Sequence, residues 1–280
     1  MSACGMLTAQ GLTVRIDGRA VVDAVDLTLQ PGEVTAIVGP NGAGKSTLMG
    51  CLAGLRRPER GEVRLADKPL SSLGDRERAQ RLGYLPQTPE IAWRLDVQTF
   101  VRLGRTAHRG VFGETALDAE AVAHALETTQ MAAFARRDIT TLSGGERARA
   151  LIARALAGEP DWLLADEPLS GLDPAHQLDA TEILRGFAKA GGGVVVTLHD
   201  LSFAARTADR IVVLAEGRII ADGAPVEALN PEVLKYAYGL EARWIDGGGG
   251  PLLDILGRHA RGPDSMDTHA KGPNAIDPHA

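Results

Sequence analysis

The stretch Gly39-Pro40-Asn41-Gly42-Ala43-Gly44-Lys45-Ser46-Thr47 fits the pattern G-x-x-x-x-G-K-[ST] of a phosphate-binding loop. Before it, Val34 to Val38 is short, apolar and β-branched, which predicts a buried strand. After it, Ser46 to Leu55 carries apolar residues at helical spacing. A strand, a glycine loop and a helix N-terminus form an anion site from backbone N–H groups. We therefore predict that Gly39 to Thr47 binds a nucleoside triphosphate.

Individual residues of this loop suit that chemistry. Gly39, Gly42 and Gly44 permit backbone angles and a close approach that a Cβ would forbid. Lys45 can reach the outer phosphates, and the hydroxyl of Ser46 can ligate Mg²⁺. The alternative, a chance glycine-rich turn, does not account for the strand before the loop or the helix after it.

Composition places the chain among globular proteins with a sizeable core. Its 280 residues are 44% hydrophobic, enough for one large domain or two small ones. A net charge of −6 provides no overall basic field for nucleic acid. The only two cysteines, Cys4 and Cys51, lie far apart, and we expect no disulfide. Neither a signal peptide nor a run of 18 apolar residues is present, so we expect an intracellular protein that reaches a membrane only through a partner.

The order of the segments predicts an α/β core with additions. Short β-type runs between Leu12 and Leu29, and again at Glu62 to Leu65, indicate an N-terminal antiparallel β subdomain. The pattern becomes helical between Val97 and Ala135, which indicates an inserted helical subdomain over about residues 88–157.

The C-terminal segment differs in composition from the rest of the chain. From Asp246 it is rich in glycine, and His259-Ala260-Arg261-Gly262-Pro263 recurs as His269-Ala270-Lys271-Gly272-Pro273. Its low apolar content predicts that residues 246–280 form a flexible, disordered tail. The repeated histidines suit weak metal binding, but duplicated tail sequence without a function is the favoured interpretation.

Four polar residues complete a hydrolytic site. Asp166 ends the apolar run Trp162 to Ala165, where it can hold Mg²⁺ through water, and Glu167 follows as a candidate base for the attacking water. Because successive strand residues point to opposite faces, we expect the two carboxylates to separate. His199 follows a second buried strand and suits a bond to the terminal phosphate. Gln87 lies where core and helical insert join and suits sensing of the metal and that phosphate. Ordinary structural roles are the alternative for Gln87 and His199.

A second anion site is predicted at Ser143-Gly144-Gly145-Glu146, where a serine and two glycines precede a helix. One nucleotide cannot easily occupy two such sites on one chain. The economical interpretation is a head-to-tail dimer in which this segment of one copy closes on the triphosphate of the other. A serine that caps its own helix is the alternative, and the two roles are compatible.

With these motifs in order, the chain resembles the ATP-hydrolysing subunit of ABC (ATP-binding cassette) transporters from about Leu7 to Leu240. The matching segments are Walker A at Gly39 to Thr47, the Q-loop at Gln87, the signature at Leu142 to Glu146, Walker B at Trp162 to Glu167, the D-loop at Ser170 to Asp173 and the switch histidine at His199.

The resemblance implies a P-loop NTPase (RecA-like) core within an ABC ATPase domain over residues 5–245. It implies ATP and Mg²⁺ as ligands, with Ser46, Gln87 and Asp166 on the metal side, and a role in catalysis for Glu167, His199 and Gln87. It also implies a homodimer bound to membrane permease subunits, indirectly served by a substrate-binding protein, with no nucleic acid. The location implied is the cytoplasmic face of the inner membrane, as a peripheral protein.

Shorter stretches indicate a group within the family. Gly83 to Gln87, Leu103-Gly104-Arg105 and Ala242 to Ile245 look like the importers of iron-siderophores, haem and cobalamin. The alternatives are the ATPase subunit of an exporter, or a non-transport ABC ATPase. The chain departs from many relatives at Ile16, where they stack an aromatic residue on adenine, and at Ala148, where they often carry glutamine. The resemblance therefore assigns no adenine contact here.

Overall fold

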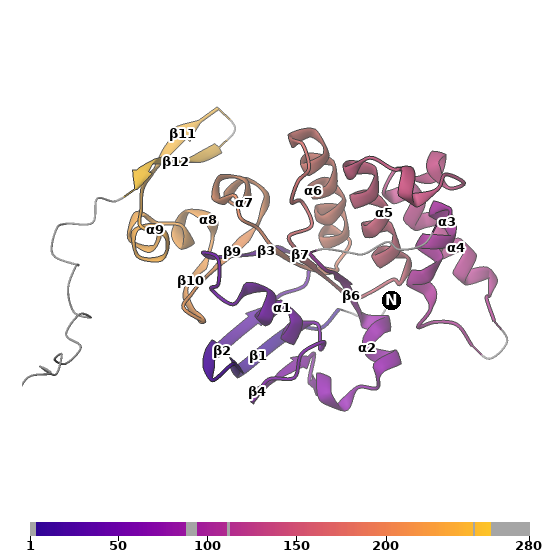
Figure 1. Ribbon diagram of the computed structural model, residues 1–280, viewed down its shortest axis with the longest axis horizontal. Helices are drawn as coiled ribbons and strands as arrows, with labels where there is room; N and C mark the ends of the chain where they lie inside the picture. The colour runs from indigo at the N-terminus through magenta and orange to yellow at the C-terminus, as the bar shows by residue number, and fades with distance from the viewer. Residues whose placement is uncertain (1–3, 88–93, 111–112, 249, 259–280) are drawn as a thin grey trace, which may run out of the picture.

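A six-stranded sheet lies at the centre of the computed structural model, which describes residues 4–87, 94–110, 113–248 and 250–258 (Figure 1). The strand order is β10-β9-β3-β8-β7-β6, with neighbours parallel except for the β9–β10 hairpin. Every residue of β3, β7 and β8 is buried, as expected for parallel strands covered on both faces. The six strands are β3 (Val34–Val38), β6 (Leu82–Leu85), β7 (Trp162–Asp166), β8 (Gly193–Thr197), β9 (Arg210–Ala215) and β10 (Arg218–Gly223).

The predicted antiparallel layer is present as a second sheet of order β2-β1-β4-β5. Its strands are β1 (Leu7–Ile16), β2 (Arg19–Leu29), β4 (Arg60–Leu65) and β5 (Lys68–Pro69). Helix α1 (Lys45–Leu52) packs between the two sheets, because its buried side chains share one core with Leu7 of β1 and Trp162 of β7. A short 3-10 turn, η1 (Leu70–Ser72), and α2 (Asp75–Arg81) then lead into β6.

Helices α3, α4 and α5 lie together at one end of the molecule (Figure 1). They have their own apolar core, which includes Val97, Val122, Met131 and Ala150. Arg105 is buried in this region, donates to Asp118 at 2.8 Å and to Glu159 at 2.7 Å, and so fixes α4 against the end of α5. The elements are α3 (Val97–Arg102), η2 (Leu103–Arg105), α4 (Ala116–Thr128), η3 (Ala132–Phe134), η4 (Ile139–Thr141) and α5 (Gly144–Ala157).

Helices from the C-terminal half build a separate core on the sheet, with Ile183 of α6, Leu201 of α7 and Leu234 of α9 among its members. These helices are α6 (Pro174–Lys189), α7 (Leu201–Thr207), α8 (Pro225–Ala228) and α9 (Pro231–Tyr238). The antiparallel subdomain, the helical segment and the parallel sheet together confirm the predicted fold class.

The prediction of a flexible tail from Asp246 is wrong as far as Arg258. Strands β11 (Leu240–Gly247) and β12 (Gly250–Arg258) pair as an antiparallel hairpin at the end opposite α3 and α4 (Figure 1). Its inner face is held because Leu253 is buried and the indole N–H of Trp244 donates to Leu229 O at 3.1 Å. Composition alone missed this packing. The repeat from His259 to Ala280 lies outside the described residues.

Candidate active site

The phosphate-binding loop follows β3 directly and ends where α1 begins, with Gly44 as the N-cap at φ 102°. A Cβ on Gly44 would overlap the backbone oxygen of Val21, and one on Gly39 would overlap that of Leu214. Both glycines are therefore required for the close approach of neighbouring backbone. The helix dipole and free N–H groups of α1 point to this loop, as the sequence pattern predicts.

Lys45 is buried and folds back onto its own loop. Its Nζ donates to Gly39 O at 2.7 Å and to Pro40 O at 3.2 Å. Burial lowers the pKa of Lys45, and the nearby carboxylates of Glu167 and Asp166 oppose that effect. The ammonium thus lies beside both acids and within reach of an anion bound in the loop.

The two adjacent acids are separated by a backbone turn. Asp166 is the last residue of β7, and Glu167 lies past the strand end at φ 52°, in the left-handed region. Alternation along a strand, the reason the sequence suggested, is therefore not what separates them. Thr197 at the end of β8 fixes the turn, because its Oγ1 donates to Asp166 Oδ1 at 2.6 Å and accepts from the Glu167 N–H at 2.8 Å.

The carboxylate of Glu167 is contacted on both oxygens. Gln87 Nε2 donates to Glu167 Oε2 at 2.6 Å, and His199 Nε2 contacts Glu167 Oε1. Glu167 is nearly buried, whereas His199 is about half exposed. Residues from two distant segments therefore converge on one acid, which is the arrangement that the sequence predicts for a base and its partners.

A cavity of about 730 Å³ gathers most of the predicted site. Asp166, which is bonded to Thr197, does not line this cavity, and neither does the signature segment Ser143 to Glu146. Val21, from β2, is a lining residue that sequence reasoning missed. The lining consists of Val21, Asn41, Gly42, Ala43, Gly44, Lys45, Ser46, Thr47, Gln87, Glu167 and His199.

The signature segment has the capping role that we had kept as an alternative. The hydroxyl of Ser143 accepts from Glu146 N–H at 3.3 Å, and Glu146 Oε2 accepts from Ser143 N–H at 2.8 Å. That second bond lowers the pKa of Glu146. Asp173 of the D-loop caps α6 in a similar way, since its Oδ1 accepts from His176 N–H at 3.1 Å.

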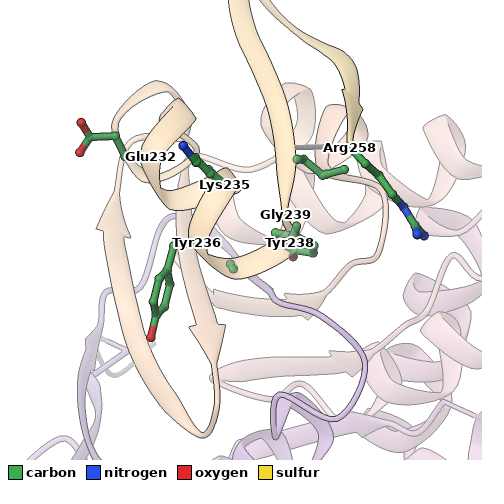
Figure 2. A pocket seen from close by; sticks show the side chains of 8 residues that line it. Glu232, Lys235, Tyr236, Tyr238, Gly239 and Arg258 are labelled. Carbon is green, nitrogen blue, oxygen red and sulfur yellow. The ribbon is translucent and has the colours of Figure 1, made fainter. Parts of the chain in front are cut away.

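A larger hollow of about 1110 Å³ lies beside α9 and contains none of the predicted site residues (Figure 2). Glu232, Lys235 and Tyr236 of α9 and Arg258 of β12 contribute to its lining. Tyr238 also lines this cavity, and its hydrogen bond with the Gly39 backbone links it to the phosphate-binding loop. Burial raises the pKa of Tyr238, and that hydrogen bond opposes the rise. Glu167, Lys45 and the phosphate-binding loop meet instead in the smaller cavity.

Two observations limit other kinds of site. Within residues 4–87, 94–110, 113–248 and 250–258, no group of three or more His, Cys, Asp or Glu side chains is arranged to hold a metal. Across the same residues, no helix combines the length and apolar character needed to span a bilayer.

Comparisons with known proteins agree with this geometry. A family model described as ABC transporter matches residues 22–170. The chain is 42% identical over 261 residues to the hemin import ATP-binding protein HmuV of Myxococcus xanthus, covering 90% of this chain and 97% of that protein. Its structure is similar to one assigned to a metal-chelate type ABC transporter in an inward-facing conformation (TM-score 0.77, 26% identity, 90% and 96% covered). It is also similar to a dimeric ATP-binding cassette bound to ADP and Pi after hydrolysis (TM-score 0.69, 27% identity, 78% and 98% covered).

The fold and the cavity define a P-loop NTPase in which Gln87 and His199 contact Glu167 in the cavity that the phosphate-binding loop lines. The chain belongs to the ATP-binding subunits of the ABC transporter family. It binds nucleotide and is an ATP hydrolase.

Proposed function

We propose that this chain energises a bacterial importer of haem or a related metal chelate, the class that also takes iron-siderophores and cobalamin. Support comes from the hemin-import names of relatives that match over nearly their whole length. The metal-chelate assignment of a similar solved transporter points the same way. The exporter and the non-transport alternatives have no comparable support among these relatives.

The observation that carries the mechanism is that the cavity holds the phosphate loop, Gln87, Glu167 and His199 but not Ser143 to Glu146. Each chain then supplies two parts of the complete sites: a nucleotide cavity, and a signature segment for the cavity of a second copy. Two copies arranged head to tail would enclose two ATP molecules. Solved cassettes described as dimers support this arrangement.

The donor set around the loop fits Mg²⁺, which prefers oxygen ligands and keeps several waters. Ser46 offers a hydroxyl, Asp166 a carboxylate, and Gln87 an amide oxygen, since it is the Nε2 of Gln87 that bonds Glu167. These three residues would hold the ion, and the ion would neutralise charge on the phosphates.

Protein groups then act on the attacking water. Glu167 accepts its proton, since its carboxylate faces the cavity that the phosphate loop lines. His199 and Gln87, which contact that carboxylate, orient it and reach toward the terminal phosphate. Lys45 leaves the carbonyls of Gly39 and Pro40 to contact the outer phosphates.

Closure of two such sites would move the helical subdomain, over about residues 88–157, relative to the parallel sheet. Gln87 connects the sheet to that subdomain and also contacts Glu167. A change at the nucleotide site that moves Gln87 would therefore also move the helices of the subdomain. Membrane permease subunits would bind here, with the chain peripheral on the cytoplasmic face of the inner membrane and the substrate-binding protein acting indirectly.

The test is reconstitution with the permease subunits encoded beside this chain. ATP-dependent uptake of haem into vesicles, lost with Glu167→Gln, is the expected result. ATP-dependent export from the same vesicles would overturn import. Failure of the chain to copurify with any multi-helix membrane subunit would instead favour the non-transport alternative.

A further inference from the structure

His176, one turn into α6, packs directly against Gly145 of the signature segment. A Cβ built on Gly145 would fall within the imidazole, 2.7 Å from Nε2 and closer still to two ring carbons. The buried Gly145 therefore has no room for a side chain while His176 is in place. The other signature glycine is different, because a Cβ on Gly144 would meet only Leu172 Cδ2, at an ordinary 3.9 Å.

The ring of His176 also lies between two carboxylates. Its Nε2 is 3.7 Å from Asp173 Oδ2 of the D-loop, and its Nδ1 is 3.6 Å from Asp179 Oδ2. Asp179 in turn lies 3.6 Å from Arg149 NH1, on the helix that the signature begins. These contacts connect the D-loop to α5 through one imidazole.

The hydrogen bonds in this cluster are incomplete. Among the described residues, the buried side-chain nitrogens without a hydrogen-bond partner include His176 Nδ1 and Arg149 Nε. Both belong to side chains that approach the same oxygen of Asp179 at 3.6 Å. A buried donor or acceptor without a partner is uncommon and destabilising. Stabilisation of the fold by hydrogen bonds therefore does not account for this cluster.

We propose that His176 is a positioning residue that sets the spacing between the signature segment (Ser143–Glu146) and the D-loop residue Asp173 of the same chain. The proposal rests on the proposed head-to-tail site, because it is there that the signature segment acts. His176 touches no nucleotide in its own chain's cavity, whose lining it does not join. It acts by holding Gly145, and with it the start of α5, at a fixed distance from the start of α6.

The experiment compares four proteins: the parent, Gly145→Ala, His176→Ala and the double variant. ATP hydrolysis is measured on each, and ATP-driven dimerisation is measured in a Glu167→Gln background by size exclusion. Gly145→Ala is expected to lower both ATP hydrolysis and ATP-driven dimerisation by about tenfold or more, because the new Cβ overlaps the imidazole of His176. His176→Ala removes the ring, so the double variant is expected to recover at least about half of that loss on a logarithmic scale.

The matched control is Gly144→Ala, alone and with His176→Ala. Its Cβ does not meet His176, so His176→Ala should give it no recovery. Binding of ATP to the isolated chain should be the same in all variants, which separates positioning of the signature from damage to the cavity. If His176→Ala folds poorly, the whole comparison is repeated with His176→Ser, which also removes the ring but keeps a polar side chain.

Recovery of Gly145→Ala, but not of Gly144→Ala, supports the proposal. Equal recovery of both, or of neither, overturns it, since the ring would then not set the position of Gly145. Absence of ATP-driven dimers even in the Glu167→Gln parent overturns the head-to-tail site and this proposal together. Dimers in that parent without recovery of Gly145→Ala overturn the role of His176 alone.

Discussion

Gln87 Nε2 lies 2.6 Å from Glu167 Oε2, so the segment that leads to the helical subdomain is bonded to the acid that follows the Walker B strand. His199 contacts the other oxygen of the same carboxylate. Each oxygen of a carboxylate has two lone pairs, so in the proposed mechanism an attacking water can still donate to Glu167 while both side chains hold it in place.

Glu167→Gln is expected to leave ATP binding intact and to lower the hydrolysis rate at least about 100-fold, because the amide cannot accept the proton. Phosphate release and equilibrium nucleotide binding, measured on the same preparation, check this. The matched control is Glu232→Gln, an exposed residue of α9, which should change neither. Full hydrolysis by Glu167→Gln would refute the assignment of the base.

Thr197→Val is expected to reduce both stability and turnover. The hydroxyl of Thr197 is fully buried and bonds both Asp166 and the Glu167 N–H, so its loss leaves buried groups unpaired at about 1–3 kcal/mol. Thr129→Val is the control, since Thr129 is equally buried but its hydroxyl donates to carbonyls of the helix that it caps, Ala125 O at 2.8 Å and Leu126 O at 3.4 Å. Denaturant unfolding and ATPase assays measure the two effects. Normal turnover in Thr197→Val would show that the turn at Glu167 does not depend on this bond.

Asp118→Asn tests the ion pair that joins α4 to the end of α5. The pKa of Asp118 is lowered, chiefly by the Thr115 backbone N–H and then by Arg105. A carboxyl with a lowered folded-state pKa stabilises the fold above its unfolded pKa, and this contribution is lost as the pH falls through the folded value. The variant should therefore melt several degrees lower than the parent near neutral pH. That difference should shrink below about pH 4, the ordinary value for Asp. A difference in melting temperature that is independent of pH would contradict this account.

Truncation tests the C-terminal hairpin. A chain that ends at Gly247 lacks β12, so it exposes the surfaces that Leu253 covers and loses the bond from Ser202 Oγ to Leu253 O. It is expected to melt several degrees lower than a chain that ends at Arg258, which keeps the hairpin. Equal melting temperatures would show that β12 does not stabilise the domain.

The parts of the site that the sequence could predict are local in the chain. Gly39 to Thr47 needs only the strand before it and the helix after it. Ser143 likewise caps the helix that directly follows it. In each case the residues that decide the structure lie within one or two turns of each other.

The features of the site that the sequence could not predict depend on which strands become neighbours in the sheet. Thr197 bonds Asp166 because β8 lies beside β7, a pairing between residues 31 positions apart. Nothing in the apolar run before Thr197 indicates that its hydroxyl would hold the turn at Glu167. The hairpin β11–β12 was missed for a similar reason, since its glycine-rich composition suggested disorder while burial of Leu253 against the helices decides its structure.

The position of Ser143 to Glu146 outside their own cavity has a kinetic consequence. In the proposed arrangement, every complete site needs two molecules, so the rate per chain in dilute solution should rise with protein concentration, as in a second-order process. Attachment of two copies to one membrane complex would replace that dependence with a fixed effective concentration. The permease would thereby control turnover by holding the two chains near each other, without contributing any residue to the chemistry.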